Sequence, residues 1–276
     1  MTTQQLLSYR GPVSTVIFDW AGTMIDFGSL APVEAFCRLF ADNRIEVSKA
    51  EVREPMGVAK RDHIAALLAI PRVKALWIER YGCNPTDHDI DRLYKKYVDF
   101  QIEAISDCTK LIDGAAVTLA WLEERGIRVG ANTGYSTEMI TTMTAKAAEQ
   151  GYRPESNICA NEVGRGRPYP DMIWRNMLQL NVETVQAVVK VDDTAVGIAE
   201  GLNAGCWTVA VAVSGNETGL SLAEWQALAN DKQALLRQQA YDRLAQSGAH
   251  YVIDTVADLP GVIEQIERRL QAGEKP

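Results

Sequence analysis

The sequence predicts an α/β protein with a doubly wound, mainly parallel, Rossmann-like sheet and an inserted all-helical cap domain. Six short apolar runs, rich in valine and isoleucine, alternate with helical patterns along most of the chain. Runs of this kind are typical of strands that are buried on both faces of a parallel sheet. A long helical block interrupts the alternation directly after the first run, and this interruption predicts the cap.

The predicted strands lie in "STVIFDW", "IRVGANT", "NICAN", "AVVKVDD", "WTVAVAV" and "YVIDT". Between and after them, helices are predicted in "AAVTLAWLEERG", "YPDMIWRNMLQL", "TAVGIAEGLNAG" and "DLPGVIEQIERRLQAG", and one long surface helix over residues 221–246. Residues 26–107 contain only helical patterns. We therefore expect a core domain of residues 1–25 and 108–276 and a cap of residues 26–107. The cap is expected over the carboxyl edge of the sheet, where open α/β sheets bind ligands.

Composition excludes several classes of function. The chain has 276 residues, of which 47% are hydrophobic, so it can bury a sizeable core. Its net charge of −8 argues against nucleic-acid or anionic-membrane partners. The N-terminus lacks the pattern of a signal peptide, and no run of 18 apolar residues occurs, so a cytoplasmic location is expected. The five cysteines form no CxxC pair, which favours reduced thiols.

Polar residues at the predicted strand ends indicate a catalytic site. In "VIFDWAGT", a buried strand delivers Asp19 to a glycine-bearing turn whose backbone N–H groups can bind phosphate oxygens. A nucleophilic carboxylate, a hydroxyl, a cation and further acids suited to Mg²⁺ together indicate phosphoryl transfer. Three later segments add these groups: Thr133 in "GANTG", Arg165 and Arg167 in "GRGRPYP", and Asp192 and Asp193 in "VKVDDT".

These four segments, in this order, resemble the motifs of the haloacid dehalogenase (HAD) superfamily. The resemblance implies that Asp19 forms an aspartyl-phosphate, that Thr133 binds the phosphoryl group and that Arg167 is its cation. It implies Mg²⁺ as the cofactor, with three ligands: Asp19, the main-chain carbonyl of Ala21, and Asp193. Many members carry an acid four residues after the last motif aspartate, where this chain has Gly197. Whether the neighbouring Asp192 compensates is open.

The residue at position 21 restricts the kind of leaving group that the reaction can have. Most superfamily phosphatases have a second aspartate there, which protonates the leaving oxygen of a phosphate monoester; alanine has no proton to give. A carbon leaving group needs an electron sink instead, and a lysine makes one by forming a protonated imine with an aldehyde. In "EPMGVAKRDHIAALL", Lys60 and His63 are three residues apart and share a helix face, so His63 could move protons for the amine.

The segments "DWAGT", "EPMGVAKRDH", "NTGY", "GRPYP" and "VKVDDT" closely resemble the phosphonoacetaldehyde hydrolase (phosphonatase) family within that superfamily. The resemblance implies Mg²⁺-dependent hydrolysis of the C–P bond of phosphonoacetaldehyde to acetaldehyde and phosphate, by a homodimer. It makes Lys60 the Schiff-base lysine and His63 its proton-transfer partner. The remaining substrate-binding residues that it implies are Met56, Gly57, Gly134 and Tyr135, beside Thr133 and Arg167.

Two alternatives remain at this point. The chain could be a HAD-type phosphate monoesterase or sugar-phosphate mutase with a helical cap, although Ala21 argues against both. It could also be a non-catalytic protein that binds a phosphorylated metabolite. The aromatic residues Trp77, Tyr94 and Tyr97 belong either to a dimer interface or to the core of the cap.

Overall fold

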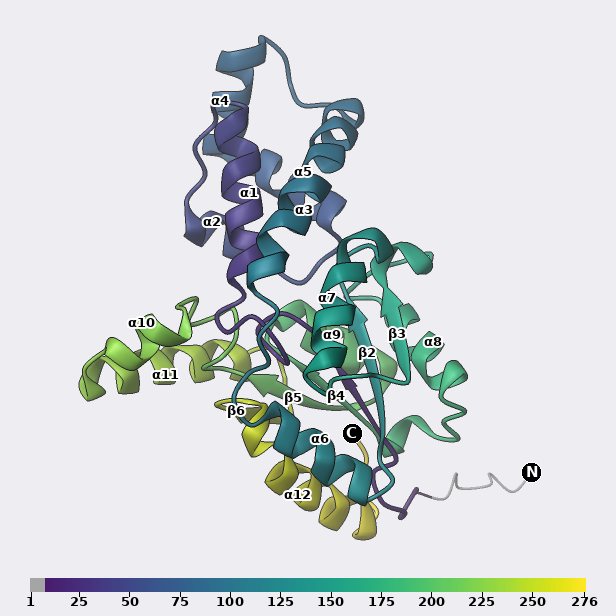
Figure 1. Cartoon of the computed structure of the whole chain (residues 1–276). Helices are drawn as coiled ribbons and strands as arrows, with labels where there is room; N and C mark the ends of the chain where they lie inside the picture. Colours follow the sequence, from purple (N-terminus) through teal and green to yellow (C-terminus); the bar gives the residue numbers. More distant parts are fainter. Residues whose placement is uncertain (1–7) are drawn as a thin grey trace.

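The computed structural model describes residues 8–276 and contains one sheet of six parallel strands in the order β3-β2-β1-β4-β5-β6 (Figure 1). The predicted fold class is confirmed, because each predicted run contains a strand. The strand β1 lies at the centre, so its end falls at the switch point where connections diverge to either side. The strands are β1 (Thr15–Phe18), β2 (Arg128–Thr133), β3 (Ser156–Cys159), β4 (Val188–Asp192), β5 (Trp207–Val211) and β6 (Tyr251–Ile253).

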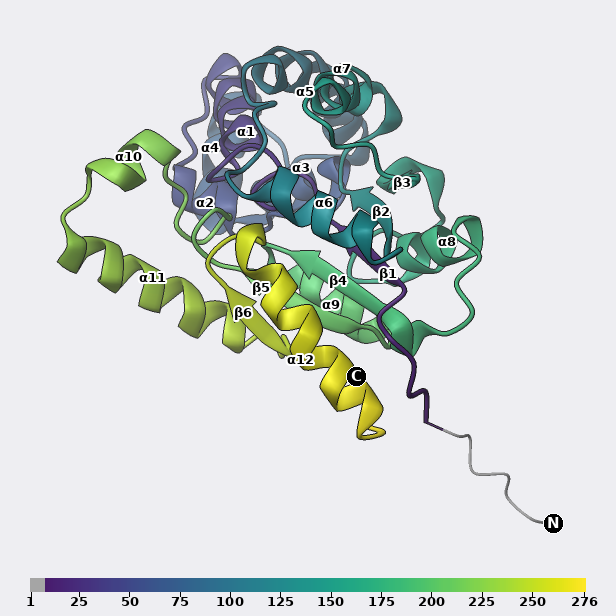
Figure 2. The same ribbon diagram turned by 60° about the horizontal axis from the view of Figure 1, so that its bottom comes forward.

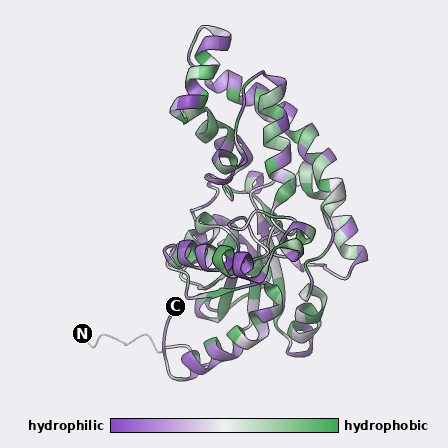
Figure 3. Ribbon diagram, turned by 90° about the vertical axis from the view of Figure 1, so that its left-hand side faces the viewer, coloured by the Kyte–Doolittle hydropathy of each residue, from purple (hydrophilic) through white to green (hydrophobic). Residues whose placement is uncertain are grey.

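Helices cover both faces of the sheet. Along β1, Val16 and Phe18 join the core on the side of α6 and α12, and Ile17 faces the side of α8 and α9. This alternation explains why the strand is apolar throughout. Figure 2 shows α6 and α12 in front of the sheet and α9 behind it, and hydrophobic residues concentrate along the strands in Figure 3. The helices are α6 (Ala115–Glu124), α7 (Thr137–Glu149), α8 (Asp171–Gln179), α9 (Ala195–Ala204) and α12 (Leu259–Gln271).

Between β1 and α6, residues 30–107 form five helices that stand over the carboxyl ends of the strands (Figure 1). The long helix α5 packs against α1, where the rings of Tyr97 and Phe36 stack with centroids 4.2 Å apart. Trp77 and Tyr97 are buried in the protein's own core. A homodimer stays a prediction, as do the exact domain boundaries. The helices are α1 (Leu30–Asp42), α2 (Lys49–Arg53), α3 (Lys60–Ala69), α4 (Pro71–Tyr81) and α5 (Asp87–Asp107).

Two details differ from the sequence analysis. The single helix predicted over 221–246 is wrong: α10 (Leu222–Ala227) and α11 (Asn230–Ala245) are separated by Leu228 and Ala229, which have extended backbones. The break leaves the last carbonyls of α10 without helical partners, and the side chain of Gln233 donates to one of them, the carbonyl of Trp225, at 2.8 Å. The helix α7 was not predicted at all. No helix in the described part of the chain is long and apolar enough to cross a membrane.

Candidate active site

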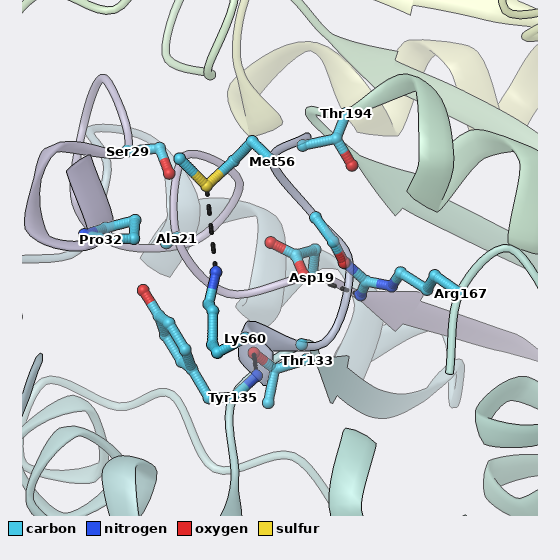
Figure 4. Close-up of a pocket in the computed structure, with 12 residues that line it drawn as sticks. Asp19, Ala21, Ser29, Pro32, Met56, Lys60, Thr133, Tyr135, Arg167 and Thr194 are labelled. Carbon is cyan, nitrogen blue, oxygen red and sulfur yellow. Dashed lines mark hydrogen bonds and ion pairs between the residues drawn. The ribbon is translucent and has the colours of Figure 1, made fainter. Parts of the chain in front are cut away.

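Side chains from the strand ends and from the helical block meet in one small cavity (Figure 4). Asp19 directly follows β1 and Thr133 ends β2, so parallel register brings both to the same edge of the sheet. The cavity has a volume of about 20 Å³. Its lining contains nine of the eleven predicted site residues, together with Ser29, Pro32 and Thr194; His63 and Asp193 are not part of it, and the nine are Asp19, Ala21, Met56, Gly57, Lys60, Thr133, Gly134, Tyr135 and Arg167.

Asp19 is held by the arginine of the "GRPYP" segment. The guanidinium of Arg167 donates from Nη2 to Oδ1 of Asp19 at 2.8 Å, and both side chains are buried. Burial and the neighbouring Asp192 raise the pKa of Asp19, and Arg167 opposes that rise. The alternative cation, Arg165, is exposed and pairs with Asp171 at 2.8 Å. Only the second arginine of the segment therefore reaches the site.

Three buried carboxylates gather beside the first turn. Oxygens of Asp19, Asp192 and Asp193 lie within 4.8 Å of one another. Asp193 Oδ2 accepts the backbone N–H of Asn216 at 2.7 Å, whereas its Oδ1 has no hydrogen-bond partner among the described residues. Burial, then Asp19 and Asp192, raise the pKa of Asp193 well above its usual range. A carboxylate oxygen left open in a crowded acidic cluster fits a hard divalent cation such as Mg²⁺.

Lys60 belongs to the first turn of α3 in the helical block, and its side chain points toward Met56 in the cavity (Figure 4). It is 5% exposed, and its Nζ lies 3.9 Å from the sulfur of Met56 and 4.9 Å from the ring centroid of Tyr135. Burial lowers the pKa of Lys60 to about 8, although the negative charge of Asp19 opposes the change. A lysine in this state supplies a neutral, nucleophilic amine near neutral pH.

His63 lies one turn beyond Lys60 and is fully buried, with its ring tilted against Phe36 at a centroid distance of 3.9 Å. Burial and the charge of Lys60 lower its pKa well below the usual range, so the ring is neutral. Its Nε2 lies 2.8 Å from the carbonyl oxygen of Val52, and this acceptor requires the proton on Nε2. Nδ1 is then an acceptor and has no partner among the described residues. No hydrogen bond joins His63 to Lys60.

The loop that carries Met56 and Gly57 is seated tightly on the core. Gly57 has a φ of +97°, and a Cβ at this position would lie 2.5 Å from the hydroxyl of Thr194. The carbonyl of Gly57 also accepts from Nη1 of Arg167 at 3.3 Å. Glycine is therefore required here for both its backbone conformation and its lack of a side chain.

The sequence model of the haloacid dehalogenase-like hydrolases matches residues 13–205 of this chain. A phosphonoacetaldehyde hydrolase of Hahella chejuensis is 53% identical over 97% of this chain and 91% of its own length. A second, from Paraburkholderia xenovorans, is 46% identical over 96% and 99%. The crystal structure of a phosphonoacetaldehyde hydrolase like protein from Oleispira antarctica matches all of both chains, with 47% identity and a TM-score of 0.98.

This chain belongs to the phosphonoacetaldehyde hydrolase family. That membership places it among the haloacid dehalogenase-like hydrolases, as its motifs indicated. The site also contains three buried residues that the sequence analysis did not select, namely Asn132, Lys190 and Glu200.

These three residues form a polar layer beneath Arg167. Oδ1 of Asn132 accepts from Arg167 Nη2 and from Lys190 Nζ, each at 2.7 Å. Its Nδ2 donates to both oxygens of Glu200 at 3.1 Å, and Glu200 Oε2 accepts from Arg167 Nε at 2.9 Å. For Lys190 and Glu200 the available signal was a charged residue flanked by apolar residues, in "VVKV" and in "AVGIAEGLNAG", because a buried charge needs a partner.

Proposed function

We propose that this protein hydrolyses the C–P bond of phosphonoacetaldehyde to acetaldehyde and phosphate, through a Schiff base on Lys60 and an aspartyl-phosphate on Asp19. One observation carries the proposal: a buried lysine with a pKa of about 8 lines the same cavity as Asp19, where residue 21 has no acid. The names of relatives that are 46% and 53% identical support the same substrate.

The phosphonate would lie among the groups at the strand ends. Arg167 offers a buried guanidinium and Thr133 a hydroxyl. Asp19, Asp193 and the main-chain carbonyl of Ala21 would hold Mg²⁺, whose positive charge would neutralise the carboxylates and attract the phosphonate. The bond from Arg167 to Oδ1 fixes the orientation of the Asp19 carboxylate.

Imine formation uses Lys60 and His63 of the helical block, together with Tyr135 from the loop after β2. The neutral amine of Lys60 adds to the aldehyde carbon, and loss of water gives a protonated imine. The ring of Tyr135, 4.9 Å from Nζ, favours the resulting cation. His63, one turn beyond Lys60, would take part through its unpartnered Nδ1, although burial lowers the pKa of the ring and so weakens it as a proton acceptor.

Phosphoryl transfer follows in the same cavity. An oxygen of Asp19 bonds to phosphorus as the C–P bond breaks, and the electron pair of that bond enters the protonated imine to give an enamine. Protonation of the enamine carbon and addition of water release acetaldehyde and free Lys60. A second water cleaves the aspartyl-phosphate and releases phosphate. One water is lost on imine formation and two are consumed, so the net reaction consumes one.

The small volume of the cavity supports a movement of the helical block during turnover. A space of about 20 Å³ holds little more than one water molecule, and the substrate is larger. Opening would admit the substrate, and closing would exclude bulk water from the imine and from the reacting phosphorus.

The deciding experiment measures phosphate and acetaldehyde from phosphonoacetaldehyde, with and without Mg²⁺, beside a panel of phosphate monoesters. Borohydride added during turnover should leave an N-ethyl group on Lys60, detectable by peptide mass spectrometry. Lys60→Ala should lose both trapping and C–P cleavage, whereas a variant of the exposed Lys95, Lys95→Ala, should keep both. Monoester turnover without phosphonate turnover would overturn the proposal in favour of a HAD-type phosphatase.

A further inference from the structure

Asp192 lies next to the candidate metal ligand Asp193, but both of its oxygens are already engaged. Oδ1 accepts from the backbone N–H and the hydroxyl of Thr194, at 3.0 and 2.7 Å. Oδ2 lies 3.0 Å from Nζ of Lys190 and 3.3 Å from Nη2 of Arg167. Neither Asp192 Oδ2 nor Asp193 Oδ1 has a hydrogen-bond partner in the described part of the chain, but only Asp192 Oδ2 lies within ion-pair distance of cationic side chains there. The adjacent carboxylates therefore have different surroundings.

The Asp192 carboxylate occupies space that exists because residue 197 is glycine. A Cβ at Gly197 would lie 2.0, 2.1 and 2.2 Å from Cγ, Oδ2 and Oδ1 of Asp192. Contacts this short do not occur between real atoms. Gly197 lies in the first turn of α9, where glycine is a poor helix former. The space taken by the Asp192 carboxylate therefore explains why glycine stands at position 197, although helix propensity disfavours it.

Asp192 lies between two buried cations. Lys190 and Arg167 both approach its Oδ2, and Arg167 also pairs with Glu200. Removing the Asp192 carboxylate would take an ion-pair partner from both cations at once, and such a loss is costly for buried groups. The same cation, Arg167, also holds Asp19.

We propose that Asp192 and Gly197 are a complementary pair, in which the Asp192 carboxylate fills the place of the absent side chain and positions Arg167 and Lys190, rather than binding the metal. Asp192 is thus a positioning residue that acts through Arg167. The part of this inference that concerns substrate binding rests on the proposed function. The steric part, the fit of residue 192 against residue 197, does not.

The steric part is tested by thermal unfolding in EDTA. Gly197→Ala should lower the Tm, and adding Asp192→Ala to it should recover part of the loss, because contacting residues couple. Gly261→Ala is the matched control: it also lies in a helix, no atom lies within 4 Å of its Cβ position, and alanine should raise or preserve the Tm. Additive effects of the changes at 192 and 197 would overturn the pair.

The positioning role is tested with Asp192→Asn, which keeps the shape and removes the charge. Its KM for phosphonoacetaldehyde should rise about tenfold or more, as expected when the binding group Arg167 is misplaced. The Mg²⁺ concentration that gives half of the maximal rise in the Tm of this variant should differ by less than about threefold from that of the unaltered protein. A rise of about tenfold or more in that concentration would show a metal ligand instead and overturn the proposal.

Relocating the carboxylate is the final test. In Asp192→Gly/Gly197→Asp, the acid would project from α9 into the same space, so KM and Tm should return toward the values of the unaltered protein. A double variant that is no better than Asp192→Gly alone would contradict the inference. If the unaltered protein does not turn over phosphonoacetaldehyde, the proposed function fails, and the Tm measurements still decide on the pair.

Discussion

A Cβ placed on Gly134 would lie 2.6 Å from the carbonyl oxygen of Val58, so the loop after β2 and the loop that carries Gly57 meet without room for a side chain. This contact joins the sheet edge that carries Thr133 to the helical block that carries Lys60. Backbone atoms cannot give way as a flexible side chain can. The closeness of Lys60 to Asp19 in the cavity therefore depends on a glycine at position 134.

We expect Gly134→Ala to hold the two loops apart and to lower kcat/KM for phosphonoacetaldehyde by about 100-fold, because small displacements of reacting groups have effects of this size. Far-ultraviolet circular dichroism should stay unchanged. Gly166→Ala is the control, since its Cβ would make only an ordinary contact of 3.7 Å with Ala59. Equal losses in the two variants would argue against a specific role of the Gly134 contact.

The pKa of Lys60 predicts the pH dependence of the reaction. Only the neutral amine adds to an aldehyde, and a pKa of about 8 leaves about one tenth of the lysine neutral at pH 7. Below pH 8, log kcat/KM should therefore rise by about one for each pH unit, and it should level off above pH 8. A profile that keeps rising to pH 10 would mean that the lysine has its ordinary pKa.

Asp193 predicts how the metal affects stability. Its raised pKa means that the folded protein holds a proton on it that the unfolded chain releases above about pH 4, so this group destabilises the metal-free fold as pH rises. Asp193→Asn should raise the Tm in EDTA at pH 7.5. Mg²⁺ should raise the Tm of the unaltered protein and leave that of the variant unchanged, as differential scanning fluorimetry can show. An equal Mg²⁺ response in both would exclude Asp193 as a ligand.

Arg53 of α2 fastens the helical block to the loop that supports Asp193. Its guanidinium donates to the carbonyls of Gly28, Asn216 and Gly219 at 3.0, 3.3 and 3.1 Å. The backbone N–H of Asn216 in turn donates to Oδ2 of Asp193. One arginine thus links the position of the block to a candidate metal ligand.

Arg53→Ala should destabilise the protein by about 2 kcal/mol, because it leaves partly buried carbonyls without donors. Urea unfolding measures this loss, and limited proteolysis should show faster cleavage between the block and the core. Arg72→Ala is the control in the same block, because Arg72 makes an exposed ion pair with Glu51 and such pairs contribute little. Comparable losses in both variants would refute the linking role of Arg53.

Much of the fold followed from local patterns. The six apolar runs predicted the six strands because a parallel sheet buries both faces of each strand, and this requirement is visible in the residues themselves. The division of residues 221–246 into two helices was missed, because neither Leu228 nor Ala229 breaks a helix by its own preference. The extended backbone at these two residues is set by packing that the local sequence does not contain.

The candidate site was also predictable from sequence only in part. Asp19, Thr133 and Asp193 could be selected from sequence, because each follows or ends an apolar run and strand ends meet at one edge. Ala21 and the Lys60 segment could be selected because their chemistry is unusual beside a phosphoryl-transfer motif. Sequence left Arg165 and Arg167 as alternatives, and only the packing shows that one is exposed and the other pairs with Asp19.

By itself, the sequence determined the sheet, the order of its strands along the chain and the residue types that reach the carboxyl edge, since periodicity and strand ends are properties of neighbouring residues. Only the tertiary structure decided which charges pair. Asn132, Arg167, Lys190 and Glu200 come from four separate segments, and their contacts arise when β2, β4 and α9 take their places around one loop. Burial then lowers the pKa of Lys60 and raises that of Asp193, because removal from water acts only in the folded chain.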